Sequence, residues 1–354
     1  MKTRTSIFAL RLAATRGLGA AALLGALALS GPAGADTIIR VGDRTLNDVR
    51  VTTEKFAEVT YEGKRGKETI DGKRIADIIH DDAPRSYRAG DGQRKGGQYA
   101  KAVESYQKAL EEGKKPWVKA WARFQIAECL RLGGKPKEAI AAYKKCTSDT
   151  EHLLYPRALV GLGIAHGDAE EWADAVSTLK KVSDGRYGLW KARADYALGQ
   201  VYIGKKSMTD ARRAFARVQN QNDDPTMRQA GVVGEGETYL AEKNFSRAIS
   251  FFERIISNRN LPPEVAAGAW AGIGDSELAL SEERKDKAAE MRALLAYLQV
   301  VVQYSGTPGA YPKALYMAAK IYEKAGLKAQ AATLRRELKS RAPSSSYAAK
   351  LKDS

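Results

Sequence analysis

The chain has 354 residues, of which 44% are hydrophobic and 28% are charged. This composition excludes a largely disordered protein and allows one extended domain beside a small one. The formal net charge is +16, which favours acidic partners or anionic surfaces over basic ones.

The first 35 residues have the layout of a secretory signal peptide. Four basic residues accompany an apolar run at residues 18–29, and Ala33-Gly34-Ala35 is a small-x-small cleavage pattern. We expect cleavage after Ala35 and an exported chain that is periplasmic or associated with the outer envelope. The alternative is a short anchor that stays attached, but a membrane span needs about 20 apolar residues. No later stretch predicts a transmembrane span in the mature chain.

Export changes the charge of the working protein. Of the 58 Lys and Arg residues, four lie in the signal segment, so 54 remain against 42 Asp and Glu, a net charge of +12. An acidic protein partner or an anionic envelope surface fits this charge. Nucleic acid is not expected, because the protein leaves the cytoplasm. The alternative is a solvated basic surface that only maintains solubility.

Residues 36–80 predict a small β domain. Short β-branched runs at residues 37–41, 49–53, 56–61 and 75–79 are separated by turn signals such as Gly42-Asp43. The pattern resembles the small SH3-like or Sm-like barrels that precede repeat arrays in some exported bacterial proteins. The alternative is an irregular hairpin that covers the first repeat.

From residue 84 onward helical periodicity replaces the β pattern, and one frame recurs. In most copies an aromatic residue is followed three positions later by alanine and then by a bulky apolar residue. The alanines are Ala102, Ala139, Ala175, Ala211 and Ala248, at steps of 37, 36, 36 and 37 residues. Two further copies follow, and a charged insertion at residues 281–287 stretches the sixth.

This frame resembles the tetratricopeptide repeat (TPR), a unit of about 34 residues folded as two antiparallel helices. Leu162-Gly163 and Leu198-Gly199, with Tyr202 three positions after the second pair, match its signature. The resemblance implies a mainly α fold, an α-solenoid of about seven TPR-like helix pairs at residues 84–342, with a basic C-terminal tail at 343–354. The sixth-repeat insertion leaves the register of the last two repeats open.

The resemblance also implies a concave wall, built by the first helix of each repeat, where such arrays hold ligands. The implied protein-binding residues are Tyr87, Arg88, Trp121, Phe124, Gln125, Glu128, Arg131, Arg157, Arg193, Tyr196 and Gln200, with Glu237 in the fifth repeat and Tyr316, Lys320 and Glu323 in the seventh. Aromatic and arginine side chains anchor interfaces, so this groove suits an extended or helical peptide with acidic groups. The alternative is that Trp121 and Phe124 complete the packing between repeats.

No residue pattern predicts catalysis, a cofactor or a metal. His80-Asp81-Asp82 is the one metal candidate, and a solvated linker is the favoured interpretation. Gly161-Leu162-Gly163 follows no strand, so helix packing explains it better than phosphate binding. Cys129 and Cys146 fall near opposite ends of antiparallel helices, which predicts two free thiols.

Two functions follow from the resemblance. The first is an exported scaffold or adaptor that mediates protein–protein interaction in the cell envelope through the concave groove. The alternative is an envelope-assembly or cell-wall-coordination factor that binds unfolded or anionic clients by charge, and steep loss of binding with salt would favour it. An enzyme would need a convergent polar cluster in a pocket, which the sequence does not show.

Overall fold

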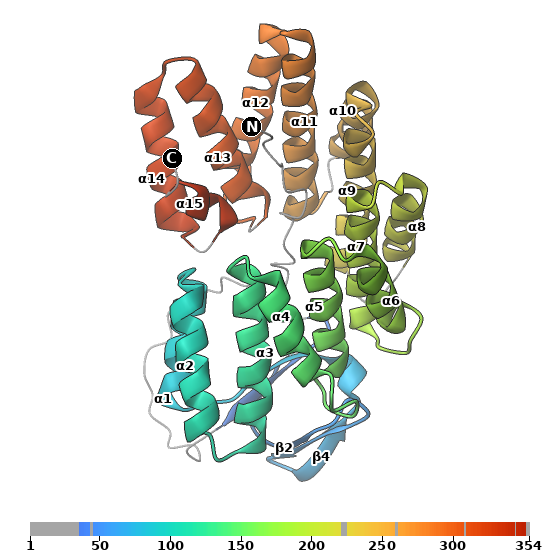
Figure 1. The fold of residues 1–354 in the computed structure, drawn as a ribbon, viewed down its shortest axis with the longest axis vertical. Helices are drawn as coiled ribbons and strands as arrows, with labels where there is room; N and C mark the ends of the chain where they lie inside the picture. The colour runs from blue at the N-terminus through green and yellow to red at the C-terminus, as the bar shows by residue number, and fades with distance from the viewer. Residues whose placement is uncertain are drawn as a thin grey trace. The chain divides into compact units, whose positions relative to one another are not determined.

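The computed structural model describes residues 35–42, 45–220, 225–258, 261–307, 309–343 and 345–351. Within these residues a five-stranded sheet precedes fifteen α-helices (Figure 1). The strands are β1 (Asp36–Arg40), β2 (Thr45–Glu54), β3 (Val59–Gly63), β4 (Gly66–Ile70) and β5 (Ile75–Ile79), with the short 3-10 helix η2 (Gly72–Arg74) before β5. The predicted signal peptide lies outside the described residues, apart from its last position.

The helices follow in the alternation of first and second repeat helices that the sequence predicts. They are α1 (Arg85–Lys95), α2 (Tyr99–Glu112), α3 (Pro116–Leu132), α4 (Pro136–Cys146), α5 (Tyr155–Asp168), α6 (Trp172–Ser183), α7 (Leu189–Gly204), α8 (Met208–Gln219), α9 (Pro225–Ala241), α10 (Phe245–Ile256), α11 (Pro263–Arg284), α12 (Lys287–Gln303), α13 (Ala310–Lys324), α14 (Lys328–Arg341) and α15 (Ser346–Lys350). The mainly α fold, with TPR-like helix pairs after a small sheet, is confirmed.

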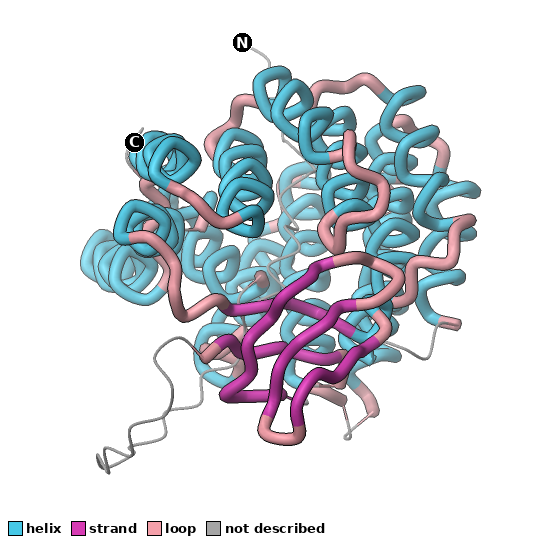
Figure 2. The backbone as a smooth tube through the Cα atoms, turned by 90° about the horizontal axis from the view of Figure 1, so that it is seen from below, coloured by secondary structure: helices cyan, strands magenta, loops and turns pink. Residues whose placement is uncertain are grey.

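Strands β1 to β4 form an antiparallel meander, and β5 pairs with the other edge of β1, which gives the order β4-β3-β2-β1-β5. The strands lie together in Figure 2. The ten-residue strand β2 serves both halves, because its first part pairs with β1 and its second part with β3. Register shifts in both ladders mark where the strands bend. The β-branched runs therefore form the small curled sheet that the sequence predicts.

Local sequence signals set the helix ends. Pro116, Pro156 and Pro263 occupy the first turns of α3, α5 and α11, where the missing amide hydrogen costs little. Asp286 caps α12 by accepting a hydrogen bond from the Ala288 amide at 2.8 Å. The charged insertion of the sixth repeat lengthens α11 to 22 residues. The helix ends at the C-cap residue Lys285, whose backbone has the left-handed conformation.

Small residues let neighbouring helices approach closely, both within a repeat and between successive repeats. The five recurring alanines are fully buried. At Gly161 an added Cβ would lie 2.5 Å from the Tyr143 ring, and at Gly274 it would lie 2.7 Å from the Tyr297 ring. Helix packing therefore explains these glycines, as the sequence predicts.

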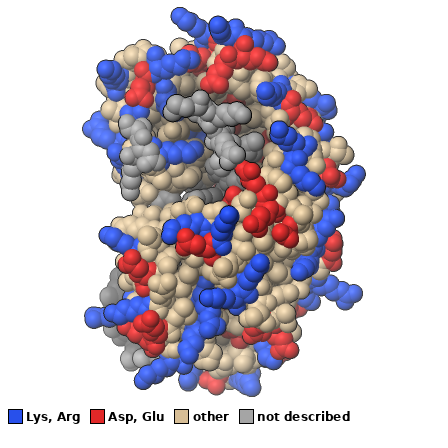
Figure 3. Space-filling model, in the orientation of Figure 1, with Lys and Arg blue, Asp and Glu red and all other residues tan. Residues whose placement is uncertain are grey.

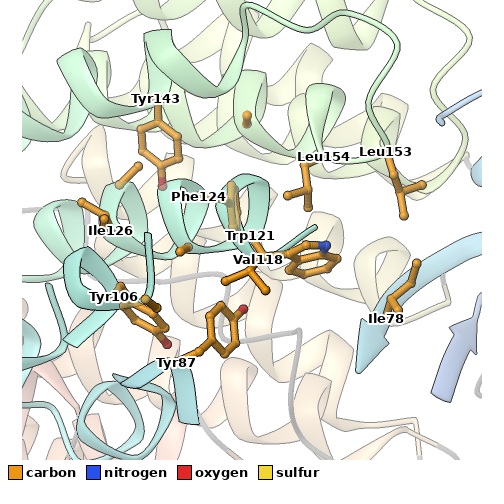
Figure 4. Packing of buried hydrophobic residues seen from close by; sticks show 14 of the residues in the cluster. Ile78, Tyr87, Tyr106, Val118, Trp121, Phe124, Ile126, Tyr143, Leu153 and Leu154 are labelled. Atoms are coloured by element: carbon orange, nitrogen blue, oxygen red, sulfur yellow. The ribbon is translucent and has the colours of Figure 1, made fainter. Parts of the chain in front are cut away.

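The described residues form two compact units that divide within α7. The first unit runs to Val201, and the second contains Tyr202–Asn220 and the described residues from Thr226 onward. In the first unit one hydrophobic core joins the sheet and the helices: Ile78 of β5 packs in the same cluster as Val118, Trp121 and Leu154 (Figure 4). A separate core in the second unit joins α11 to α15.

The end of the chain differs from a plain tail. Ser345 caps α15 by accepting a hydrogen bond from the Ala348 amide at 3.0 Å. Ala348 is 5% exposed, and the rings of Tyr347 and Tyr316 lie 5.6 Å apart. The segment predicted as a basic tail therefore begins with a helix that packs on α13. No helix in the described ranges is both long and apolar enough to cross a membrane.

Candidate functional site

The wall predicted from the first helices of the first unit is largely enclosed. Trp121, Phe124, Gln125, Tyr87, Arg193, Tyr196 and Gln200 are buried, Glu128, Arg131 and Arg157 are half-buried, and Arg88 is exposed. The structure thus brings most of these residues into the protein interior. Trp121 and Phe124 fit the alternative interpretation, since both take part in packing. The binding role of the eleven residues remains a prediction.

The sheet itself covers part of this wall. The Trp121 indole nitrogen donates a hydrogen bond to Oε2 of Glu54, at the end of β2, over 2.6 Å. Asp77 of β5 accepts a hydrogen bond from Arg157 of α5 at 3.1 Å. Further out, the ring of Phe56 lies 5.3 Å from that of Tyr187. A partner would have to displace these contacts to reach Trp121.

Arginine side chains stack on the aromatic residues beneath the sheet. The Arg157 guanidinium carbon lies 4.7 Å from the Phe124 ring centre and 5.6 Å from that of Trp190. The guanidinium carbon of Arg193 lies 4.6 Å from the ring centre of the same Trp190. Cation–π contacts gain strength when water is excluded. The arginine and aromatic side chains that the sequence suggested for ligand binding therefore contact one another inside the protein.

His80 lies at the centre of the junction between sheet and helices. Its Nδ1 is 3.3 Å from Oδ1 of Asp36, its Nε2 is 2.9 Å from Oε1 of Glu54, and its ring stacks on Trp117 at 3.9 Å. Burial disfavours the imidazolium, but the interactions with the two carboxylates outweigh it and raise the pKa of His80. The solvated-linker interpretation was wrong, because this side chain is only 4% exposed.

The same junction brings together side chains of metal-ligating types. His80 and Asp82 belong to the metal candidate that the sequence offers, and the structure adds Asp36 to them. Ligand atoms of Asp36, His80 and Asp82 lie within 4.8 Å of one another. Asp36 also accepts hydrogen bonds from the Val51 and Asp81 amides, and Lys115 pairs with Asp82. Since each group has a partner in the chain, we assign the cluster to joining the sheet to the helices.

The second unit presents its first-helix wall differently. Inside it, Lys313 of α13 pairs with Asp275 of α11, whose other oxygen accepts a hydrogen bond from Tyr297 at 2.7 Å. Nearby Tyr316 and Tyr347 are partly exposed, and Lys320 and Lys350 are exposed. We call these last four residues the tyrosine–lysine cluster.

The tyrosine–lysine cluster gathers positive charge. The Lys320 and Lys350 ammonium nitrogens lie 5.8 and 5.7 Å from the Tyr316 ring centre, and the latter lies 4.9 Å from that of Tyr347. Burial, together with the charges of Lys320 and Lys313, lowers the pKa of Lys350. Within the described residues neither Lys320 nor Lys350 forms an ion pair. A carboxylate or phosphate would supply the missing negative charge.

Sequence reasoning found half of this cluster. Tyr316 and Lys320 occupy the wall positions that the TPR resemblance implies. It missed Tyr347 and Lys350, because they lie beyond the last repeat in a segment without the repeat frame. The cap signal Ser345, followed by a short apolar stretch, was the available hint.

The two cysteines are free thiols, one buried and one half-buried. Burial raises the pKa of both Cys129 and Cys146 to about 12. Thiols with such a pKa are poor nucleophiles at neutral pH. They belong to the packing of α3 and α4.

Comparisons with known proteins agree with this architecture. Tetratricopeptide-repeat family models match residues 87–148, 160–225 and 313–345. A search of curated proteins found no match.

Among solved structures, a tetratricopeptide repeat protein from Parabacteroides merdae is 16% identical, with 73% of this chain and 94% of that chain covered and a TM-score of 0.46. The C-terminal part of a TPR repeat-containing protein from Cytophaga hutchinsonii is also 16% identical, with coverages of 73% and 95% and a TM-score of 0.39. For pilF of Pseudomonas aeruginosa the identity is 18%, the coverages are 64% and 93%, and the TM-score is 0.40.

The repeat matches fall on the helix pairs described above, in both units. They include the first helices that pack beneath the sheet and the α13–α14 pair that carries half of the tyrosine–lysine cluster. The chain therefore carries tetratricopeptide repeats at residues 87–148, 160–225 and 313–345, after a small β sheet.

Proposed function

We propose that this protein is an exported scaffold of the cell envelope that binds an acidic peptide segment of a partner at the tyrosine–lysine cluster. The observation that carries the proposal is the pair of exposed ammonium groups, both within 6 Å of the Tyr316 ring and both without an acidic partner in the described part of the chain. TPR folds serve protein interaction, and the net charge of the chain favours an acidic ligand.

The cluster suits a peptide better than a single ion. Two partly exposed tyrosine rings offer apolar surface beside the two cations, and aromatic residues with nearby charge are typical of interface anchors. An acidic side chain would pair with Lys320 or Lys350, while neighbouring peptide atoms would pack on Tyr316. The role is binding rather than catalysis, since the proposal involves no bond chemistry.

A direct test is fluorescence anisotropy with a labelled peptide of alternating glutamate and glycine. The double variant Lys320→Gln/Lys350→Gln should weaken binding at least tenfold, because each charge-assisted hydrogen bond is worth about 1.5–3 kcal/mol and a tenfold loss needs only about 1.4 kcal/mol. The matched control Lys144→Gln/Lys145→Gln removes two exposed lysines of α4 and should bind like wild type. Unchanged binding in the first variant would refute the cluster as the site.

Salt dependence separates the second candidate function, a factor that binds anionic clients by overall charge. The basic composition favours it. In that case both double variants would weaken binding equally, and affinity would fall steeply between low and high salt. A cluster-specific site predicts a difference between the two variants that persists at high salt.

Export rests on the N-terminal sequence pattern alone. Intact-mass measurement of protein recovered from the envelope fraction should give a chain that begins at Asp36. Recovery of the uncleaved chain from the cytoplasm would contradict export but would leave the proposed peptide binding unaffected.

A further inference from the structure

A second charged surface lies on α14, apart from the tyrosine–lysine cluster. A groove of about 350 Å³ runs along this helix and is lined by Lys328, Ala331, Ala332, Arg335, Arg336 and Lys339, with Glu323 of α13 at its side. Lys and Arg side chains line the upper left edge in Figure 3, where α14 lies in Figure 1. The proposed binding at the tyrosine–lysine cluster does not involve this groove.

The charge of the groove is strongly one-sided. Four cations line it, and its one lining carboxylate, Glu323, is already paired with Arg335. The acidic residue of α14 itself, Glu337, accepts a hydrogen bond from Tyr311 and so is engaged elsewhere. The groove therefore offers three cations that no lining carboxylate neutralises, which favours an anionic ligand.

The spacing of the cations indicates an elongated ligand. Lys328 and Lys339 are eleven positions apart on one helix, a span of about 16 Å at 1.5 Å per residue. Positions 328, 332, 335 and 339 follow the spacing of one helix face. A single phosphate or carboxylate would reach only part of this row, whereas a chain with several acidic groups could pair along all of it.

The floor of the groove favours a helix as that ligand. Ala332 is exposed and has only a methyl side chain, and Ala331 beside it is almost fully buried, so the backbone of a docked helix can approach α14 closely. The aliphatic stems of the surrounding Lys and Arg residues add apolar walls while their charged ends stay at the rim. We propose that this α14 groove binds an acidic amphipathic helix of a partner protein, with small or apolar residues against the alanines and carboxylates against the rim.

The test uses the purified full chain and a labelled helical peptide of about 18 residues. The peptide carries glutamates at i, i+4, i+7 and i+11 on one face and alanine or leucine elsewhere. A scrambled peptide of equal composition and vesicles of phosphatidylglycerol and phosphatidylcholine serve as alternative probes. The helical peptide should bind at least tenfold more tightly than the scrambled one.

The variant Arg336→Gln/Lys339→Gln removes two exposed cations of the groove and should weaken binding of the helical peptide about tenfold. Lys144→Gln/Lys145→Gln is the matched control and should leave it unchanged. The comparison is repeated in the background of the cluster variant Lys320→Gln/Lys350→Gln, so that binding of the acidic peptide at the tyrosine–lysine cluster does not mask binding at the groove. Thermal unfolding checks that each variant is folded, and Lys328→Glu, at the other end of the row, provides an independent second variant.

Equal binding of the scrambled and helical peptides would overturn the proposal. It would also be overturned if the wild-type protein bound the vesicles and the Arg336→Gln/Lys339→Gln variant did not, because the groove would then be a lipid-binding site. Absence of binding to the helical peptide would also overturn it. The cluster variant and the groove variant are measured in parallel. A negative result for the groove variant therefore leaves the proposed binding at the tyrosine–lysine cluster intact, and a negative result for the cluster variant leaves the proposed α14 groove intact.

Discussion

The two units use the same repeat element in different ways. In the first unit the first-helix wall carries Trp121, Arg157 and Trp190, and the N-terminal sheet packs on it through Glu54 and Asp77. In the second unit the corresponding helix α13 carries Tyr316 and Lys320, which remain accessible. Aromatic and cationic residues at a wall position therefore do not by themselves mark a binding site. Such residues are available for a ligand only where no other part of the chain already contacts them.

The largest effect should come from removing the anchor of the covered wall. Trp121→Ala deletes a side chain that is 3% exposed and leaves the Glu54 carboxylate without its indole donor. We expect a loss of about 3–5 kcal/mol in the free energy of unfolding of the first unit, measured by urea denaturation. A loss below 1 kcal/mol would show that the sheet does not depend on this contact, and would reopen Trp121 as a ligand residue.

The ion pair between β5 and α5 should matter somewhat less. Arg157→Met keeps much of the side-chain volume but leaves Asp77 without this partner, and we expect a loss of about 2–3 kcal/mol. A double-mutant cycle with Asp77→Asn should recover part of it, since both charges are then absent. Strict additivity of the two changes would mean that the pair does not hold the sheet in place.

His80 should make the junction sensitive to pH. Its pKa is raised in the folded protein, so its stabilising contribution is complete below the unfolded value of 6.5 and is lost as pH rises through the folded value. The pKa of Asp36 is lowered despite its burial, because it bonds to His80 and to the Val51 amide, so its contribution fades as pH falls through that lowered value. Urea midpoints of wild type should fall with rising pH in the upper window.

The variant His80→Gln is the control for this titration. It keeps hydrogen-bonding capacity but has no group that titrates near neutral pH. We expect a flat profile in the upper window, while the decrease at acidic pH remains. An unchanged slope above pH 6.5 would assign the effect to another group.

The smallest effect should come from the exposed wall of the second unit. Lys320→Gln/Lys350→Gln removes two neighbouring like charges that have no acidic partner among the described residues. Stability should change by less than about 0.5 kcal/mol, while peptide binding weakens. A destabilisation above 1 kcal/mol in thermal unfolding would mean that these lysines serve the packing of α15 rather than a ligand.

The repeat architecture was predictable because it depends on local, periodic signals. Ala102, Ala139 and Ala175 are fully buried, as their regular steps implied. The helix pairing follows from the same frame, and the curled sheet from β-branched runs between turns.

The covering of the wall was not predictable in this way. Glu54 and Trp121 are 67 positions apart, and Asp77 and Arg157 are 80 apart. Nothing in the period of the repeats records such pairings, so His80 looked like part of a linker. A buried histidine with two carboxylates can be recognised only when three distant segments are placed together.

The sheet's position has a consequence for synthesis. Strand β5 ends at Ile79, whereas the helix that carries Trp190 begins at Leu189, about 110 residues later. At about 5–20 residues per second, a ribosome needs roughly 5–20 seconds to make that stretch. The docking surface is completed only at the end of this interval. Trp117 and Trp121, which contact His80 and Glu54, are made first, and Arg157, the partner of Asp77, follows them. A nascent chain thus passes through a period in which its first-formed element is also its least protected.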